Sequence, residues 1–294
     1  MEGLTGFVFR NAYQKHFGNI DTYFTPFINN KKMNYKEIKD ILPEHNEGMH
    51  VVPQILTNRA EDFLAIAKEL GNYGYESVNL NLGCPSGTVV AKHRGAGFLA
   101  VPEELDHFLE EIFAECPLRI SVKTRVGVND AGEWEHLLFI YEKFPMEELI
   151  IHPRVQKDFY NNTPDMEAFL YAVENSRHTL CYNGDICSVE DYRTWRQQME
   201  EKRKCAFMQE SGQQTDPELS LIHISEPTDP EDTASLVSHL MLGRGVLKNP
   251  GLIGELTGHA PITKDQFHAF HDDILKGYLD VMSGERNTLF RMKE

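Results

Sequence analysis

One cysteine lies in a loop bounded by glycine and proline, directly after a β-rich run of the chain. The loop spans residues 81–87 and reads N-L-G-C-P-S-G, with Cys84 at its centre. If the preceding run is a strand of an α/β barrel, the loop lies at the carboxyl end of that strand, where catalytic side chains of this fold collect. A thiol held there is a competent general acid near neutral pH. A lone cysteine is most often a small buried hydrophobe, but this loop favours the chemical interpretation.

Three polar side chains interrupt apolar β-rich runs elsewhere in the chain. Lys123 lies in S-V-K-T-R-V-G, His152 lies in I-I-H-P-R, and Gln54 lies in V-P-Q-I-L. A charged or polar group in an apolar strand needs a partner or must face a ligand. An imidazole at the end of a strand can hydrogen-bond a planar ring system. The sequence leaves two alternatives open: a lysine at the exposed end of its strand, and a hydrogen-bonded core histidine.

Two glycine-containing turns follow the last two β-rich runs. They are N-G-D at residues 183–185 and G-R-G at residues 243–245. Barrels commonly build a phosphate site at this place from backbone amides and helix N-termini. Arg244 adds a permanent positive charge suited to bidentate phosphate contact. Each turn alone is weak evidence, but together they predict a phosphate-bearing cofactor.

The elements that must position these residues alternate short β-rich runs with longer amphipathic segments, which indicates βα units and a parallel sheet. Seven predicted strands span residues 23–27, 51–56, 77–81, 119–126, 148–152, 179–183 and 239–242. Helical spacing of apolar residues marks segments 59–73, 103–115, 134–143, 166–175 and 189–198. The pattern predicts an α/β fold of the (β/α)8 TIM-barrel type, which has eight strands. Residues 1–6 resemble a strand-to-helix loop with no strand before it, so we expect the first strand to be missing upstream.

Two domains are expected. Residues 1–258 would form the barrel and residues 259–294 the beginning of a small helical domain, with a helical pattern over 262–282. The chain ends inside a further helical pattern, which indicates truncation at this end too. Residues 199–230 are polar and too long for an ordinary helix-to-strand connection. Because residues 219–228 resemble translated sequencing-adapter read-through, this atypical insertion is a candidate foreign segment; a genuine surface insertion is the alternative.

Composition narrows the class of protein. No run approaches the roughly 18 uninterrupted apolar residues of a membrane span and no signal peptide is evident, so we expect a cytoplasmic protein. Five scattered cysteines without a C-x-x-C pair predict neither a disulfide framework nor a metal site. The formal net charge of -16 argues against an RNA partner at long range. Lys92, His93 and Arg94 nevertheless form a local basic cluster beside the cysteine loop, with a solvated turn as the alternative.

Taken in order, N-L-G-C-P-S, V-K-T-R-V-G, I-H-P-R, N-G-D-I and M-L-G-R-G, preceded by M-E-G-L-T-G, resemble the motifs of the tRNA-dihydrouridine synthases over most of the chain. The resemblance implies an FMN-binding barrel enzyme that is reduced by NADPH. Hydride would pass from the flavin to C6 of a flipped-out uracil in tRNA, while a cysteine protonates C5. A C-terminal helical domain would grip the tRNA, and this chain would hold only its beginning.

The same resemblance assigns roles to individual residues. Cys84 matches the proton-donating cysteine, and Asn81 would help to position the uracil. Lys92 and Arg94 are expected to contact the tRNA because they belong to the local basic cluster. The residues expected beside the isoalloxazine ring are Met1, Glu2, Gln54, Lys123 and His152. The residues expected around the phosphate are Asn183, Gly184, Asp185, Gly243 and Arg244.

Two other interpretations stay open. The first is another FMN barrel oxidoreductase, similar to dihydroorotate dehydrogenase, which also places an N-x-x-C-P-like loop near its flavin. Residues that bind a free carboxylate would favour it, and the sequence shows no convincing set. The second is an inactive truncated or chimeric product. The sequence specifies neither the uridine that is modified nor the oligomeric state.

Overall fold

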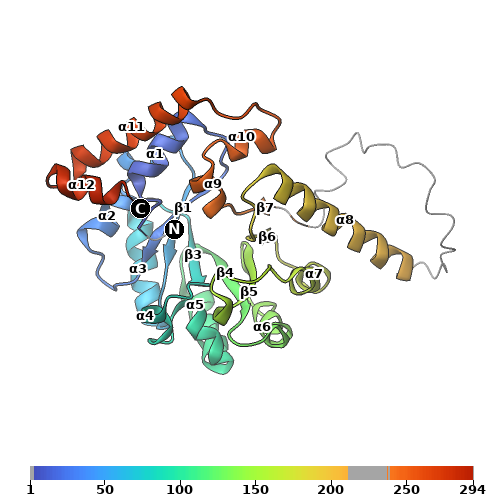
Figure 1. The fold of residues 1–294 in the computed structure, drawn as a ribbon. Coiled ribbons are helices and arrows are strands. Elements are labelled where there is room, and N and C mark those ends of the chain that lie inside the picture. Colours follow the sequence, from blue (N-terminus) through green and yellow to red (C-terminus); the bar gives the residue numbers. More distant parts are fainter. Residues whose placement is uncertain (1–2, 211–236, 238, 294) are drawn as a thin grey trace, which may run out of the picture.

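The computed structural model describes residues 3–210, 237 and 239–293. Its centre is a seven-stranded sheet whose strands all run parallel and follow chain order from β1 to β7 (Figure 1). The strands are β1 (Tyr23–Ile28), β2 (Val51–Ile55), β3 (Ser77–Leu82), β4 (Arg119–Gly127), β5 (Leu149–Val155), β6 (Leu180–Tyr182) and β7 (His239–Leu240). All seven predicted strands are confirmed. Sequential parallel order is that of a (β/α)8 barrel, and within the described residues β1 and β7 form the two edges of the sheet.

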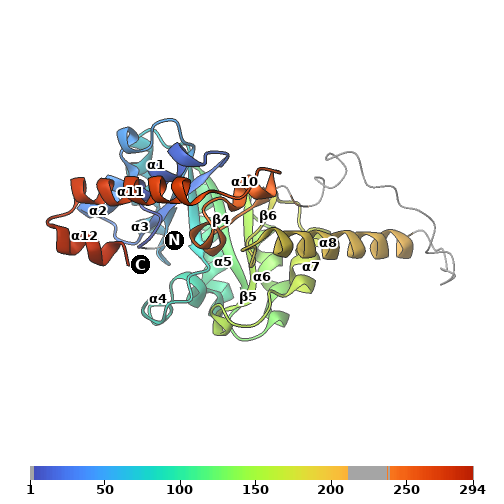
Figure 2. The same ribbon diagram turned by 45° about the horizontal axis from the view of Figure 1, so that its top comes forward.

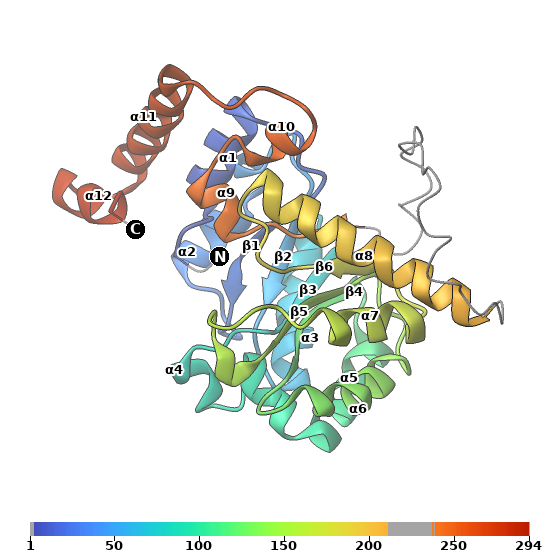
Figure 3. The same ribbon diagram turned by 45° about the vertical axis from the view of Figure 1, so that its right-hand side comes forward.

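Helices connect the strands and cover the outside of the curved sheet (Figures 1 and 3). They are α1 (Phe7–His16), α2 (Tyr35–Ile41), α3 (Ala60–Asn72), α4 (Gly87–Val90), α5 (Pro102–Glu115), α6 (Trp134–Tyr141), α7 (Met166–Asn175), α8 (Val189–Glu210), α9 (Arg244–Lys248), α10 (Leu252–Leu256), α11 (Lys264–Val281) and α12 (Glu285–Arg291). There are also four short 3-10 helices among the described residues: η1 (Pro43–His45), η2 (Gly95–Ala100), η3 (Ala131–Glu133) and η4 (Gln156–Asp158). The five predicted helices and the helical pattern at 262–282 are confirmed. Helix α2 was missed, although Asn34 and Glu37 form the capping box at its start.

The main apolar core lies between the outer face of the sheet and these helices. Helix α3 contributes Phe63, Ile66 and Leu70 at helical spacing, and all three are fully buried. Strand residues such as Leu80 and Ile151 belong to the same buried apolar cluster. Because successive side chains of a strand point to opposite faces, this packing leaves the alternate residues of each strand for the barrel interior.

Helix α8 corrects one expectation. Residues 199–210 continue the helix that was predicted to end near residue 198, so the first part of the expected irregular insertion is helical. The reason lies in its helix-forming residues with pairs at four-residue spacing, such as Arg196–Glu200 and Gln197–Glu201. Figure 3 shows α8 reaching past the edge of the sheet. The remainder of the predicted insertion, residues 211–230, lies outside the described residues.

The C-terminal helix α11 packs directly on α1 (Figure 2). Phe270 of α11 makes edge contacts with Phe9 and Tyr13 of α1 and with Phe17 directly after it, with ring centroids 5.0 to 6.0 Å apart. Asp273 accepts hydrogen bonds from side chains of α1 beside this aromatic cluster. Helix α12 ends at Arg291, so the last helical pattern closes before the final residues of the chain. None of the described helices is long and apolar enough to cross a membrane.

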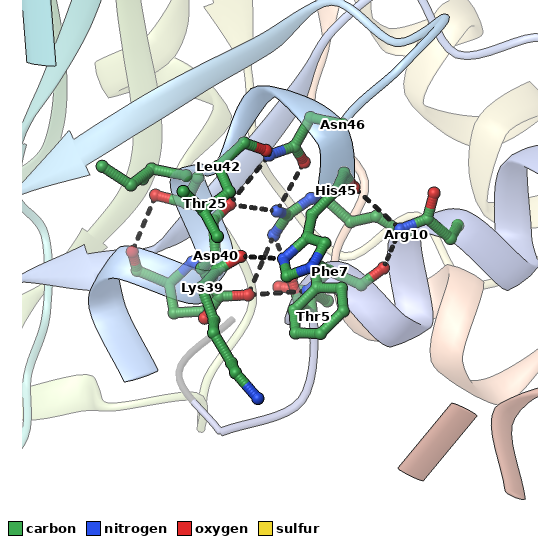
Figure 4. Close-up of polar contacts among 12 residues, drawn as sticks. Thr5, Phe7, Arg10, Thr25, Lys39, Asp40, Leu42, His45 and Asn46 are labelled. Carbon is green, nitrogen blue, oxygen red and sulfur yellow. Dashed lines mark hydrogen bonds and ion pairs between the residues drawn. The ribbon is translucent and has the colours of Figure 1, made fainter. Parts of the chain in front are cut away.

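The N-cap of helix α1 is Gly6, which has no side chain to cap the helix, and Asp40 of α2 supplies the missing acceptor (Figure 4). Asp40 Oδ1 accepts the Phe7 N–H at 2.6 Å. Arg10 is buried beside it and donates to Thr5 O, Asp40 O and the Asn46 side chain. A carboxylate at the start of a helix also complements the helix dipole. Asp40 therefore fixes the direction in which the N-terminal loop enters α1.

Replacing Asp40 with alanine is expected to lower the free energy of unfolding by about 1 to 2 kcal/mol, the usual cost of a lost N-cap. Asp40→Asn should lose less, because an amide oxygen can still accept the Phe7 N–H. Urea denaturation of both variants checks this order. Equal losses in the two variants would show that the capping hydrogen bond contributes nothing.

Candidate active site

Cys84 lies in a loop that Asn81 holds in shape. Asn81 Oδ1 accepts the backbone N–H groups of Gly83 and Cys84, both at 3.0 Å. Ala96 N donates to Cys84 O on the other side. Gly95 has φ +54°, and a Cβ there would approach Cys84 O to 2.8 Å, so glycine is required for this close contact. The expected loop at the carboxyl end of a strand is present, and Asn81 orients it.

A chain of hydrogen-bonded polar side chains crosses the barrel interior below this loop. Gln54 donates to Asn79 at 2.9 Å and accepts from Asn81 at 2.7 Å. Asn79 donates in turn to Ser121 at 2.9 Å. Gln54 thus has partners on both sides, and these hydrogen bonds tie β2 to β3, the strand that precedes the cysteine loop. Its expected contact with an isoalloxazine ring stays a prediction.

Lys123 follows Ser121 on the same face of β4 and lies beside the cysteine loop. A Cβ placed on Gly83 would be 3.7 Å from Lys123 Nζ. The backbone of Lys123 belongs to the β4 ladders, but its ammonium group forms no hydrogen bond and no ion pair among the described residues. Burial, together with the charge of Arg125, lowers the pKa of Lys123 to about 8. The alternative of a lysine at the exposed end of its strand is therefore wrong, and the ammonium group is available to a ligand.

Because the pKa of Lys123 falls from 10.5 to about 8, the folded protein holds this proton less tightly than the unfolded chain does. The contribution of Lys123 to stability should therefore rise between about pH 8 and pH 10.5. Lys123→Met should remove this rise and stabilise the protein at pH 7 by on the order of 1 kcal/mol. Urea unfolding from pH 7 to pH 10 measures the difference. Lys143→Met, at a surface ion pair, is the control, and matching pH profiles for the two variants would contradict the assignment.

His152 is buried on β5 in a defined protonation state. Its Nδ1 lies 2.5 Å from Asn183 O, and its Nε2 lies 3.4 Å from Nη1 of Arg154. A carbonyl only accepts and a guanidinium only donates, so Nδ1 carries the proton and Nε2 is the acceptor. Burial lowers the pKa of His152 to about 2, and the charges of Lys123 and Arg125 add to this effect. The ring is therefore neutral across the physiological range.

Two buried arginines of the site were missed by the sequence analysis. Arg125 donates to Gly83 O at 2.9 Å, Val155 O at 2.9 Å and Phe159 O at 2.6 Å. Arg154 lies two residues after His152 on the same face of β5 and is buried as well. The signal was present, because residues 121, 123 and 125 and residues 152 and 154 repeat every second position. Tyr160, which is 53% exposed, was also missed and lies against the guanidinium groups of Arg125 and Arg244.

The five residues expected around a phosphate lie together after β6 and β7. Asn183 donates to Met241 O and so joins the two turns. A Cβ on Gly184 would lie 2.0 Å from the Tyr182 hydroxyl, so only glycine fits there. Asp185 forms ion pairs with both Arg154 and Arg244. Gly243 precedes helix α9, which Arg244 begins.

The remaining predicted positions lie at the rim or outside the described residues. Arg94 is within 3.4 Å of Asn58 Oδ1 and donates to Asn29 O at 3.3 Å, which ties the basic cluster to the loops after β1 and β2. Lys92 is exposed beside it. Met1 and Glu2 lie outside the described residues, so their expected place beside the flavin has no structural account.

The fold and the site together define an α/β-barrel protein in which a cysteine loop and several cationic side chains meet at the carboxyl ends of the strands. A family model described as dihydrouridine synthase (Dus) matches residues 1–238. The chain belongs to the dihydrouridine synthase family.

Individual relatives agree with this assignment. A probable tRNA-dihydrouridine synthase of Staphylococcus epidermidis is 29% identical over 197 residues, which cover 63% of this chain and 59% of that protein. Probable tRNA-dihydrouridine synthase 2 of Bacillus subtilis is 28% identical over 162 residues, which cover 54% of this chain and 49% of that protein. The matches thus span about half to three fifths of these relatives. The solved structure of a variant of NCR from Zymomonas mobilis superposes with a TM-score of 0.51 at 13% identity, covering 96% of this chain and 92% of that one, which shows a shared fold.

Proposed function

We propose that this protein reduces uridine to 5,6-dihydrouridine in tRNA, with FMN as its cofactor and NADPH as the reductant. The observation that carries the proposal is the cysteine loop, in which Asn81 holds Cys84 at the mouth of the barrel beside Lys123. Family membership and the names of the relatives support the substrate class. The proposed place of action is the cytoplasm, because tRNA is present there.

The residues present fit a flavin with a phosphate. Lys123 offers an ammonium group without a hydrogen-bonding partner among the described residues, which suits the polar edge of an isoalloxazine ring. The backbone N–H groups of Gly184, Gly243 and Arg244 donate to no acceptor within the described part of the chain. Together with the Arg244 guanidinium they form a set of donors suited to a phosphate. Bound FMN would supply the hydride that C6 of the uracil receives.

The protein's own groups then have separable tasks. Cys84 gives its thiol proton to C5, so that the C5=C6 double bond becomes a single bond. Asn81 holds the loop and therefore the direction of the thiol. Neutral His152 and Lys123 define the polar surroundings of the ring, where fixed charges act without solvent rearrangement. Hydride and proton must reach adjacent carbons, which requires this fixed geometry.

The RNA partner must be accommodated by a chain of net charge -16. Local basic residues at the mouth, Lys92 and Arg94 among them, would contact phosphates near the reacting base. Turning the base out of its stack costs a few kcal/mol, and uridines in tRNA loops reduce that cost. We therefore expect weak, strongly salt-dependent binding of tRNA to the chain as it stands.

The test is a direct assay of the purified chain. After incubation with FMN, NADPH and unmodified tRNA, dihydrouridine is measured by mass spectrometry of the nucleosides, with dihydroorotate oxidation measured in parallel. Dihydrouridine without dihydroorotate turnover is the expected result. Flavin binding with turnover of dihydroorotate alone would replace the proposal by the rival barrel oxidoreductase, and the lack of any flavin binding would overturn it.

A further inference from the structure

Arg154 is the most highly connected side chain of the site. Its Nε donates to Asn161 O at 2.9 Å and Asn162 O at 3.1 Å, and its Nη2 donates to Asn162 O at 2.6 Å. The same Nη2 forms an ion pair with Asp185, while Nη1 reaches His152. The side chain is about 1% exposed. Burying a guanidinium costs several kcal/mol, so a buried arginine needs a full set of acceptors, and here they come from three separate parts of the site.

One of these contacts defines His152. The Asn183 carbonyl receives the Nδ1 proton, which leaves Nε2 as a lone-pair acceptor facing Arg154. Both ring nitrogens are therefore directed by their neighbours, and the plane of the imidazole is restrained between them. Without Arg154 the Nε2 side of the ring would lose its donor.

A second contact leads to Arg244. Asp185 uses one carboxylate oxygen for Arg154 and the other for Arg244. Arg154 is buried and Arg244 is exposed, so Asp185 joins a buried cation to an exposed one. The carboxylate would otherwise be an unpaired negative charge beside the proposed phosphate, where it would repel the ligand.

A third contact restrains the loop after β5. Asn162 has φ +59°, a left-handed conformation that few residues other than glycine adopt, and its carbonyl accepts two donors of Arg154. The adjoining Tyr160 lies against Arg244, 4.6 Å from ring centroid to guanidinium carbon. Both sides of Arg244 are thus set by groups that depend on Arg154.

We infer that Arg154 is a positioning residue of this site: it orients His152 directly and places Arg244 through Asp185, so that the ring end and the phosphate end of the flavin site are coupled. The inference rests on the proposed function. Lysine cannot replace it fully, because one ammonium group cannot reach the carboxylate, the imidazole and two carbonyls together.

A double-mutant cycle tests the coupling. Dissociation constants for FMN and for riboflavin are measured for the wild-type protein, Arg154→Met, Arg244→Ala and the double variant. Arg154→Met is expected to weaken the binding of riboflavin several-fold and the binding of FMN by about tenfold more than that. In the Arg244→Ala background this additional loss for FMN should disappear. A merely structural effect would weaken both ligands by one factor in both backgrounds, and that result would overturn the inference.

Arg10→Met is the matched control, because Arg10 is equally buried and donates to the same kinds of acceptor, but its hydrogen bonds go to Thr5, Asp40 and Asn46 and not to the His152–Arg154–Asp185 group (Figure 4). It should leave the FMN to riboflavin ratio unchanged. Arg154→Lys keeps the charge opposite Asp185 and should restore part of the wild-type ratio of the FMN and riboflavin dissociation constants. This variant replaces Arg154→Met in the test if Arg154→Met does not fold.

A readout on the flavin-free protein separates this inference from the proposed function. The protein is produced with nitrogen-15-labelled histidine, and the Nε2 resonance of His152 is assigned by its loss in His152→Asn. This resonance should shift in the Arg154→Lys variant and stay in place in the Arg10→Met variant. If the wild-type protein binds neither flavin, the proposed function fails while this spectrum still decides the contact between Arg154 and His152. An unchanged Nε2 resonance would overturn the positioning role.

Discussion

Replacing Cys84 with alanine is expected to lower the rate of dihydrouridine formation by about 10²- to 10⁴-fold, the range for a positioned general acid. Flavin affinity and NADPH oxidation should stay close to the wild-type values, because in the proposed reaction the thiol acts only on C5 of the uracil. The physical reason lies in the loop: Asn81 binds its backbone N–H groups, so the loop keeps its shape when the thiol is removed. Single-turnover assays on unmodified tRNA with pre-reduced flavin measure the step directly.

Two further variants sharpen this test. Cys84→Ser should remain slow, because a hydroxyl is a far weaker acid than a thiol. Cys116→Ala removes a different half-buried thiol at the end of α5 and should leave the rate unchanged. A wild-type rate in Cys84→Ala would remove Cys84 from the reaction and leave the loop with a structural role alone.

Much of the fold could be predicted from local patterns. The seven strands are short apolar runs, and helices such as α3 repeat apolar residues at helical spacing. Each of these patterns can be recognised within a short stretch of the sequence. Helix α8 was predicted too short because its later residues lack an apolar stripe, although they favour a helix by propensity. Helix α2 was missed because a seven-residue helix gives too little periodicity to detect.

The candidate site was predictable only in part. Cys84 and Lys123 were selected because each interrupts an apolar or glycine-bounded run. Arg154 follows His152 by two residues and could have been found by the same alternation. Its pairing with Asp185 could not, because the two residues belong to different strand ends, and sequence gives no distance between them.

Because the sequence gives no distances between strand ends, it also could not show the partners of Asp185, which was predicted to lie beside a phosphate. A carboxylate in that place would repel the ligand, and the structure gives it two arginines instead. The local pattern N-G-D identified the turn correctly. The electrostatic meaning of its last residue depended on partners elsewhere in the chain.

Replacing Arg244 with alanine is expected to weaken the binding of FMN by about 10- to 100-fold, because charged hydrogen bonds contribute about 1.5 to 3 kcal/mol. Riboflavin, which lacks the phosphate, should lose less than about threefold. The loss should lie toward the upper end, because the variant also removes one of the two cations that neutralise Asp185. Titration of the flavin-free protein with each ligand, followed by flavin fluorescence, gives both constants.

The control for Arg244 is Lys248→Ala, which removes the same unit of charge from the exposed end of the same helix, α9. It should change both dissociation constants less than about twofold, because an exposed charge is screened by salt. Raising the salt concentration should reduce the effect of Lys248→Ala while leaving most of that of Arg244→Ala, whose guanidinium would contact the phosphate directly. Equal losses of FMN and riboflavin in Arg244→Ala would place the phosphate away from the turns after β6 and β7.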